Sequence, residues 1–486
     1  MAAGESAIRG GAAVAASTGS RYLLRFGVTV ILARLLTPEQ FGVVAMMTAV
    51  FSIGTVFQEL GLSAATVQRT SVSSQAISTL FWINTGMGAV LTLAFGALSP
   101  LIAAFYSRPE LTLLCAVTSV TFVLNGMAVQ HRAVLQRQMR FGVQARINVA
   151  PPVIGGIVAL LIAWKGGGIW SLAGQIIVTD ALTLILLMWA APLPLVRPTL
   201  TREARELLRF GVSLFGFQLV YAIASNLYVV LLGRSAGAVA TGIYTRALAL
   251  VVIPQSFVYM SAGYVALPKL SKLKESDSEF AIFYYRSLEL VALISAPTVV
   301  LFALFADQIA VCAYGNQWGE VPALLRIFSL GMAIAPILHS TSQVFAARGE
   351  GQRFFRWGVV SACVMCATAL VGLNWGMRGV AWGWSASAVI LLLPGLRYAF
   401  EGTHLTIRGV IAACTNAWAA AVCMVPAGWL ARHLLSGVSV WIQLPLSSAF
   451  CLLVYLLLAW FVFRQRELMS SVLRLVFGRR AAQLPS

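Results

Sequence analysis

The sequence predicts an all-α, polytopic membrane protein with about fourteen transmembrane helices. Of its 486 residues, 59% are hydrophobic and only 10% are charged, and the mean hydropathy is +0.85, far outside the range of soluble domains. A bilayer-spanning helix needs about 20 mainly apolar residues, and such runs recur from residue 10 to residue 463 with short interruptions. No soluble domain fits between them, so we expect lipid to surround most of the chain.

Apolar runs that end at turn or charge signals define the individual helices. The first run is too long and too often interrupted by arginine for a cleavable signal peptide, so it is counted as a helix. Pro151 and Pro152 fall inside the fifth run, and three glycines at 166–168 separate it from the sixth. The predicted spans are 10–34, 40–62, 79–105, 110–130, 147–164, 169–190, 207–232, 240–266, 281–306, 321–346, 357–373, 378–399, 409–431 and 440–463.

Loop charges predict the orientation of the chain. The formal net charge is +18, but the basic residues lie in short loops between apolar spans, which favours the positive-inside pattern over nucleic-acid binding. One set of loops carries 18 lysines and arginines, and this majority places that set and both termini in the cytoplasm. The opposite, outer set has only Arg34, Arg108, Lys165, Arg234, Arg378 and Arg432.

A weak internal repeat predicts the domain organisation. A shift of 200 residues aligns Leu32-x-Arg34 with Leu232-x-Arg234 and Gly42 with Gly242. A more visible match, of 23–28 with 207–212, is rejected because it equates a mid-membrane arginine with one at a helix entrance. We therefore predict two parallel, pseudo-symmetric six-helix lobes around a central cavity, two additional helices, and a basic cytoplasmic tail that lies along the anionic inner surface. These regions are 1–200, 201–400, 401–463 and 464–486.

Two arginines are predicted near the bilayer midplane. The first span is centred near residue 22, which places Arg21 and Arg25 one turn apart on one face. Burying a guanidinium at this depth costs about 2.5 to 3.5 kcal/mol, so lipid cannot be their neighbour. Either they face a hydrated cavity and bind a phosphate, or they pair with carboxylates such as Asp180 and Glu59 and hold the bundle together. We favour the cavity, because an ionisable residue at this depth is by default a functional hypothesis.

The two carboxylates are candidates for binding a coupling ion or for acting as counter-ions. Asp180 lies near the middle of the sixth predicted helix, where it is a candidate counter-ion or proton carrier. Glu59 lies at the cytoplasmic end of the second helix. Reaching into water, or pairing with a loop residue, explains Glu59 at least as well.

Polar and aromatic side chains recur in the second half, on the seventh and eighth predicted helices. They suit contacts with sugars, and they suit ordinary interhelical hydrogen bonds equally well. The candidates for substrate binding there are Gln218, Tyr221, Asn226 and Gln255, with Tyr228 on the same helix as the first three.

Catalytic and cofactor motifs are absent from the sequence. It contains no Walker A sequence, no His-Glu-x-x-His and no Gly-x-Ser-x-Gly, so no catalytic residue and no ATP hydrolysis are predicted. Cys363 and Cys366 lie in an apolar run with too few polar partners for a metal or redox site, so we expect neither metal nor cofactor. The longest outer loop, from Asp307 to Glu320, leaves no room for a catalytic domain.

Four stretches of the first 200 residues carry a family resemblance. They are Ala33-Arg34-Leu35-Leu36-Thr37-Pro38-Glu39-Gln40-Phe41-Gly42, Glu59-Leu60-Gly61-Leu62-Ser63-Ala64-Ala65, Ser78-Thr79-Leu80-Phe81-Trp82-Ile83-Asn84 and Gln130-His131-Arg132-Ala133-Val134-Leu135-Gln136-Arg137. These stretches resemble the polysaccharide-exporter branch of the multidrug/oligosaccharidyl-lipid/polysaccharide (MOP) flippase superfamily, especially its colanic-acid and lipopolysaccharide exporters. The second half is similar mainly in pattern.

The resemblance implies a lipid-linked oligosaccharide flippase of the bacterial inner membrane. Its implied features are two lobes arranged as a V, alternating access, and an undecaprenyl-diphosphate-linked cargo for exopolysaccharide or lipopolysaccharide biosynthesis. Arg21 and Arg25 would supply the cationic cavity lining that is common in the family. The helices at 409–431 and 440–463 would cradle the lipid tail, and a polysaccharide polymerase and co-polymerase are implied partners.

Three alternatives are weaker, the first from the same superfamily and the others from different classes of protein. An ion-coupled small-molecule efflux antiporter favours carboxylates in its cavity because its cargo is often cationic, whereas the predicted midplane charge here is positive. A membrane polysaccharide polymerase or glycosyltransferase needs a sizeable outer loop carrying catalytic groups, and the sequence lacks one. A purely structural membrane protein would be consistent with the sequence only if both midplane arginines are paired.

Overall fold

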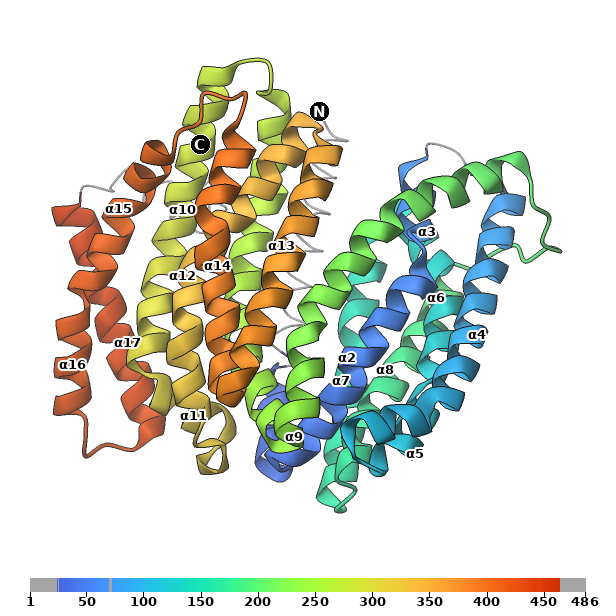
Figure 1. The fold of residues 1–486 in the computed structure, drawn as a ribbon, viewed down its shortest axis with the longest axis horizontal. Coiled ribbons are helices and arrows are strands. Elements are labelled where there is room, and N and C mark those ends of the chain that lie inside the picture. Colours follow the sequence, from blue (N-terminus) through green and yellow to red (C-terminus); the bar gives the residue numbers. More distant parts are fainter. Residues whose placement is uncertain (1–23, 25, 70–71, 464–486) are drawn as a thin grey trace, which may run out of the picture. The chain divides into compact units, whose positions relative to one another are not determined.

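The computed structural model describes residues 24, 26–69 and 72–463, and in this part of the chain it contains helices and no strands (Figure 1). An apolar helix at Phe26–Leu35 comes first. The others are α2 (Pro38–Glu59), α3 (Leu62–Gln68), α4 (Ser74–Tyr106), α5 (Glu110–Thr118), α6 (Val120–Arg137), α7 (Phe141–Trp164), α8 (Ile169–Ala190), α9 (Arg202–Lys272), α10 (Asp277–Leu304), α11 (Ala306–Tyr314), α12 (Val321–Arg348), α13 (Gly351–Gly372), α14 (Gly376–Phe400), α15 (Ile407–Cys423), α16 (Val425–Leu434) and α17 (Val440–Leu457).

Eleven helical segments of the described chain are long and apolar enough to cross a membrane. Two of them, Gln218–Ser256 and Gly351–Phe400, each overlap two of the predicted spans. Each contains a glycine with positive φ, Gly237 (φ 79°, ψ −175°) and Gly376 (φ 61°, ψ −150°), where the backbone leaves the helical conformation. Most residues cannot adopt this conformation without strain, so the glycines mark the ends of successive helices. The first predicted span, 10–34, lies mostly outside the described residues.

Five predicted helix starts fall four to six residues too late. α9 begins at Arg202 rather than 207, α10 at Asp277 rather than 281, and α13 at Gly351 rather than 357. α4 begins at Ser74 rather than 79, because the hydroxyl of Ser73 accepts a hydrogen bond from the Ala76 amide (3.2 Å) and caps a polar first turn. α7 begins at Phe141 rather than 147 and continues through Pro151 and Pro152. A search for apolar runs does not detect helix ends that are set by capping and by polar turns, which explains these differences.

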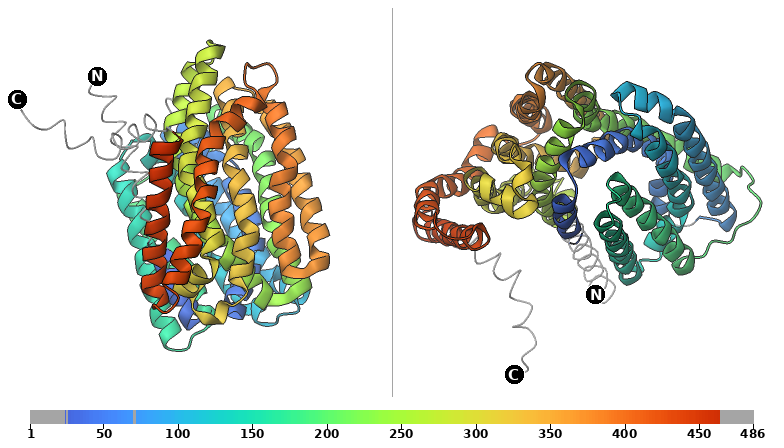
Figure 2. Two further views of the ribbon diagram at one scale, coloured as in Figure 1. Left: turned by 90° about the vertical axis from the view of Figure 1, so that its left-hand side faces the viewer. Right: turned by 90° about the horizontal axis from the view of Figure 1, so that it is seen from below.

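The chain forms two compact units. Unit 1 comprises Met1–Arg246 and Gly358–Val380, and unit 2 comprises Ala247–Trp357 and Ala381–Ser486. One core cluster of unit 1 packs Leu135 of α6 against Leu184 and Leu187 of α8. In unit 2, α15 and α17 pack against α10. The C-terminal helices α15, α16 and α17 lie at one edge of that unit (Figure 2).

Gly42 and Gly242 allow a close backbone contact inside unit 1. A Cβ atom added to Gly42 would lie 1.8 Å from the carbonyl oxygen of Ala238, and one added to Gly242 would lie 1.8 Å from that of Pro38. Gly42 and Gly242 are 200 residues apart, as are Pro38 and Ala238, and 200 is the shift at which the sequence repeats. The start of α2 and the segment of α9 after Gly237 therefore touch through equivalent residues of the two repeats.

The connector between α8 and α9, residues 191–201, contains no helix and is hydrogen-bonded along α4. Ser78 Oγ donates to the Val196 carbonyl (2.7 Å), and Thr79 Oγ1 donates to the Thr199 carbonyl (3.0 Å). Beyond it, Arg69 pairs with Glu206 of α9 at 2.6 Å. This hydrogen-bonded guanidinium lowers the pKa of the Glu206 carboxyl below its usual value. The connector is thus fastened to α4 before the chain enters α9.

Candidate functional site

The two midplane arginines of the sequence analysis, Arg21 and Arg25, lie outside the described residues. The first helix that the structure describes, Phe26–Leu35, begins directly after Arg25. Their role in binding phosphate stays a prediction.

Asp180 lies in the middle of α8, the position along the helix that the sequence predicts. Its Oδ2 accepts a hydrogen bond from Asn125 Nδ2 at 2.7 Å, and both side chains are half-buried. Asn125 also donates to the carbonyl of Thr121 on its own helix, α6. An amide from a neighbouring helix is therefore one partner of this carboxylate. That position keeps Asp180 a candidate counter-ion or coupling group at midspan.

Glu59 is the last residue of α2, and its side chain is exposed. The next two residues, Leu60 (φ 43°) and Gly61 (φ 67°), are left-handed, so the chain turns immediately after it. A carboxylate at such a turn can reach water, and its role as a counter-ion remains a prediction.

The polar residues of the second half have different surroundings. The Asn226 amide donates to the Ala222 carbonyl of its own helix (2.8 Å), and the buried Tyr228 hydroxyl bonds to Thr368 of α13 (3.0 Å). Tyr228 therefore serves an interhelical contact. Gln218 is half-buried and Tyr221 is 61% exposed. Gln255 is buried, and its Nε2 has no hydrogen-bond partner among the residues that the structure describes.

A fully buried polar network in unit 1 was missed by the sequence analysis. Gln130 Nε2 donates to Asn84 Oδ1 (3.0 Å), Asn84 Nδ2 donates to the Gln58 carbonyl (2.9 Å), and Gln58 Nε2 donates to the Phe122 carbonyl (2.6 Å). Thr66 Oγ1 completes the network by donating a hydrogen bond to Gln130 Oε1 (3.2 Å). The network ties α2, α3, α4 and α6 together. The available signal was a single amide inside each of three apolar runs: Gln58, Asn84 and Gln130.

His131 and Arg140, both in unit 1, hold the C-terminal end of α8. His131 Nδ1 lies 2.7 Å from the Ala191 carbonyl oxygen, and Arg140 Nη1 donates to the Ala190 carbonyl (2.6 Å). They satisfy carbonyls that a helix C-terminus leaves without partners. Asn84, Gln130 and His131 belong to stretches that carry the family resemblance, so part of that resemblance reflects packing rather than cargo.

The Asn84 network predicts that replacing Asn84 destabilises the protein much more than replacing an exposed asparagine does. Asn84→Leu should lower the free energy of unfolding by about 1 to 3 kcal/mol, because it strands a buried amide of Gln130. The control is the exposed Asn374, whose amide donates to the Val371 carbonyl of its own segment. Asn374→Leu should change the free energy of unfolding by roughly 0.5 kcal/mol or less. Thermal melting of the two purified variants checks this. Equal melting temperatures would contradict it.

A cavity lined by polar side chains in unit 2 is too small to hold a sugar. Tyr284 of α10 and Ser340 of α12 share a hydrogen bond of 2.7 Å beside His339 and Gln343. The cavity there measures about 10 Å³, room for one water at most. Within the described ranges, no three His, Cys, Asp or Glu side chains gather as metal ligands would.

Similarity to solved structures defines the class of protein. Lipid II flippase MurJ in an inward closed conformation matches with a TM-score of 0.74 at 14% identity, over 94% of this chain and 99% of that one. An inward-facing multidrug resistance MATE transporter of the MOP superfamily matches with a TM-score of 0.64 at 18% identity, over 80% and 96%. At such identities the likeness shows the fold alone. The chain is an all-helical integral membrane protein with a MurJ- and MATE-like fold.

The family is shown by sequence. The family model described as "Polysaccharide biosynthesis protein" matches residues 31–323, more than half of the chain. The chain therefore belongs to this family, the polysaccharide branch of the MOP flippase superfamily, whose members are transporters and not enzymes.

Curated relatives agree with this assignment. Teichuronic acid biosynthesis protein TuaB of Bacillus subtilis is 25% identical over 69% of this chain and 70% of its own length. Lipopolysaccharide biosynthesis protein WzxC of Escherichia coli is 22% identical over 70% of each. Succinoglycan biosynthesis transport protein ExoT of Rhizobium meliloti is 23% identical over 75% of this chain and 78% of its own.

Proposed function

We propose that the chain is a flippase that moves an undecaprenyl-diphosphate-linked oligosaccharide from the cytoplasmic to the periplasmic leaflet. The observation that carries the proposal is the family match over residues 31–323 in a chain with the MurJ-like fold. The flipped oligosaccharide serves exopolysaccharide or lipopolysaccharide biosynthesis. Transport proceeds by alternating access, and a polysaccharide polymerase and co-polymerase receive the product.

The proposed architecture has fourteen spans, in two pseudo-symmetric six-helix lobes (1–200 and 201–400) followed by two helices (401–463). The structure describes eleven spans, and dividing the two long segments at Gly237 and Gly376 gives thirteen. The predicted helix at 10–34 is the fourteenth. The reciprocal contact of Gly42 with Ala238 and of Gly242 with Pro38 supports the repeat, because equivalent residues meet around a local pseudo-twofold axis.

The proposed cargo site uses residues of both halves. Arg21 and Arg25 bind the diphosphate, since planar guanidiniums suit phosphate oxygens. Gln218, Tyr221, Asn226 and Gln255 contact the sugars. Asp180 and Glu59 bind the coupling ion or act as counter-ions, and the midspan position of Asp180 supports its part in this.

We propose that both termini lie in the cytoplasm, with the 464–486 tail on the inner surface of the bacterial inner membrane. An even number of spans and the excess of basic residues in one set of loops support this. A C-terminal alkaline phosphatase fusion should be inactive, and a cytoplasmic reporter at the same site should be active. An exported, active phosphatase would rule out the even number of spans.

Transport itself is tested with purified full-length protein in vesicles. A fluorescent undecaprenyl-diphosphate oligosaccharide placed in both leaflets should become fully accessible to a membrane-impermeant quencher, whereas protein-free vesicles should protect about half of it. Unchanged protection would contradict the flippase. Proton-coupled export of cationic dyes by the same vesicles would instead favour the efflux antiporter.

A further inference from the structure

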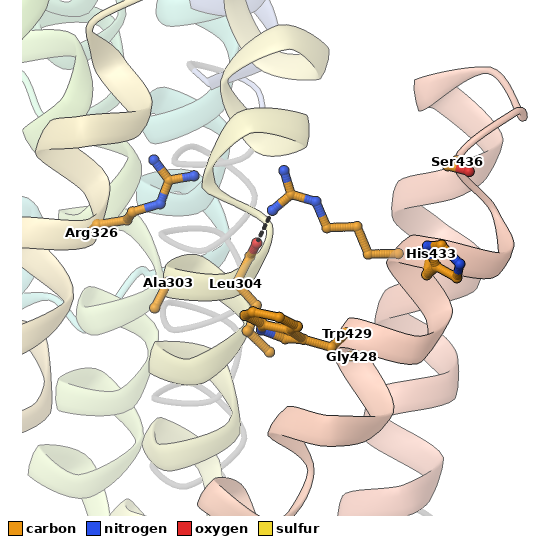
Figure 3. Close-up of a pocket in the computed structure, with 8 residues that line it drawn as sticks. Ala303, Leu304, Arg326, Gly428, Trp429, His433 and Ser436 are labelled. Carbon is orange, nitrogen blue, oxygen red and sulfur yellow. Dashed lines mark hydrogen bonds between the residues drawn. The ribbon is translucent and has the colours of Figure 1, made fainter.

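Unit 2 contains a cavity that the proposed cargo route does not use. It has a volume of about 560 Å³ and lies between the end of α10, the start of α12, and α16 (Figure 3). Loop charges place this end of the helices on the outside, because Arg432 belongs to the sparse outer set. Its walls include Leu304, Arg326, Trp429, Arg432, His433 and Ser436.

Two guanidiniums at this cavity share one carboxylate. Arg326 Nη2 lies 2.6 Å and Arg432 Nη2 lies 3.0 Å from the same oxygen, Oδ2 of Asp307 on α11. Arg432 Nη1 also donates to the Leu304 carbonyl at 3.4 Å, the dashed line in Figure 3. One carboxylate neutralises one of the two cations, so this group of three side chains keeps a net positive charge.

An oxyanion fits the remaining donors. The side chains of Arg326 and Arg432 are 45% and 47% exposed, so part of each guanidinium is open to a ligand. Each guanidinium has more N–H groups than its bonds to the described residues use. His433 and the Ser436 hydroxyl line the same cavity and add donors. A tetrahedral phosphate accepts hydrogen bonds from two such arginines at once.

The surroundings favour a phosphate that is attached to a lipid. Trp429 is 69% exposed, and Leu430 and Leu434 on the same helix are 52% and 70% exposed. In a transmembrane helix, exposed apolar side chains of this kind contact lipid, and tryptophan is enriched at the level of the headgroups. Basic pockets between transmembrane helices bind anionic headgroups for the same electrostatic reason.

We propose that this cavity binds the phosphate of an anionic membrane lipid at the outer surface, held by Arg326 and Arg432. Asp307 competes with the phosphate for both guanidiniums and holds them in place when the lipid is absent. The site does not depend on the nature of the transported cargo.

The first test measures phosphatidylglycerol binding to the purified full-length protein in detergent by native mass spectrometry. Arg326→Gln and Arg432→Gln should each weaken binding about tenfold, the effect of losing one hydrogen bond to a charged group. Arg234→Gln removes an exposed arginine of the same predicted side, stacked near Phe105 of unit 1, and should bind as the wild type does. Equal binding by all four proteins would overturn the site.

Asp307→Asn separates a lipid site from a purely structural ion pair. Removing the competing carboxylate should tighten phosphatidylglycerol binding several-fold, even though it lowers the melting temperature of the lipid-free protein. Weaker or unchanged binding would overturn the proposal. Two further ligands identify the source of the phosphate: zwitterionic phosphatidylcholine should bind more weakly than phosphatidylglycerol, and inorganic phosphate should not raise the melting temperature. Stabilisation by inorganic phosphate equal to that by the lipid would contradict a lipid site.

Discussion

Replacing Arg21 or Arg25 with alanine should abolish polymer export and leave the protein folded in the membrane. The two arginines are predicted one turn apart near the bilayer midplane, where each uncompensated guanidinium costs about 2.5 to 3.5 kcal/mol. If they face a hydrated cavity and bind the diphosphate, their removal takes away binding without disturbing packing. Export by a strain that carries only the variant, measured together with membrane abundance, gives the result.

Further variants separate a role in binding the diphosphate from a role in holding the helices together. Arg21→Lys and Arg25→Lys should keep partial export, because an ammonium retains the charge and loses the planar fork. Arg34→Ala, on the same predicted helix but near its outer end, is the control and should export normally. If the arginines only pair with Asp180, the alanine variants should lose abundance, and Asp180→Asn should restore it. Normal export by a well-expressed Arg21→Ala, Arg25→Ala double variant would end the diphosphate proposal.

Gly42→Ala should be among the most destabilising single substitutions in unit 1. The new Cβ would lie 1.8 Å from the Ala238 carbonyl oxygen, less than any real carbon contact, so the two backbones have to separate. Overpacking of this kind costs roughly 1 to 3 kcal/mol or more. Gly242→Ala should have an effect of the same size, because its Cβ meets the Pro38 carbonyl at the same distance. Membrane abundance and thermal melting measure both.

The glycine pair also predicts an interaction between the two substitutions. One separation of α2 from α9 makes room for both methyl groups, so the double variant should lose less stability than the two single losses added together. Gly86→Ala is the control: it lies inside α4, its added Cβ meets nothing within 4 Å, and it should be neutral. Strictly additive losses, or a loss for Gly86→Ala as large as for Gly42→Ala, would contradict the shared contact.

The candidate cargo site could be predicted only in part from the sequence. Asp180 was expected at midspan, because position along an apolar run gives depth directly, and α8 places it there. The partners of polar residues were not predicted. Tyr228 was a possible sugar contact and proved to bond to Thr368, 140 residues away along the chain. Depth is a local property, whereas a partner depends on which helices pack together.

The sequence by itself determined that this protein is a helical membrane transporter. A span requires only a local run of about 20 apolar residues, so composition and run length predicted the helices. The exceptions are the starts of α4, α7, α9, α10 and α13, whose first turns contain polar residues and begin four to six residues before the predicted spans. Only the tertiary structure decided which distant side chains meet. Asn84 and Gln130 lie 46 residues apart, and Arg432 is 125 residues from Asp307. Such contacts follow from the packing of whole helices against one another, and no local pattern of residues specifies that packing.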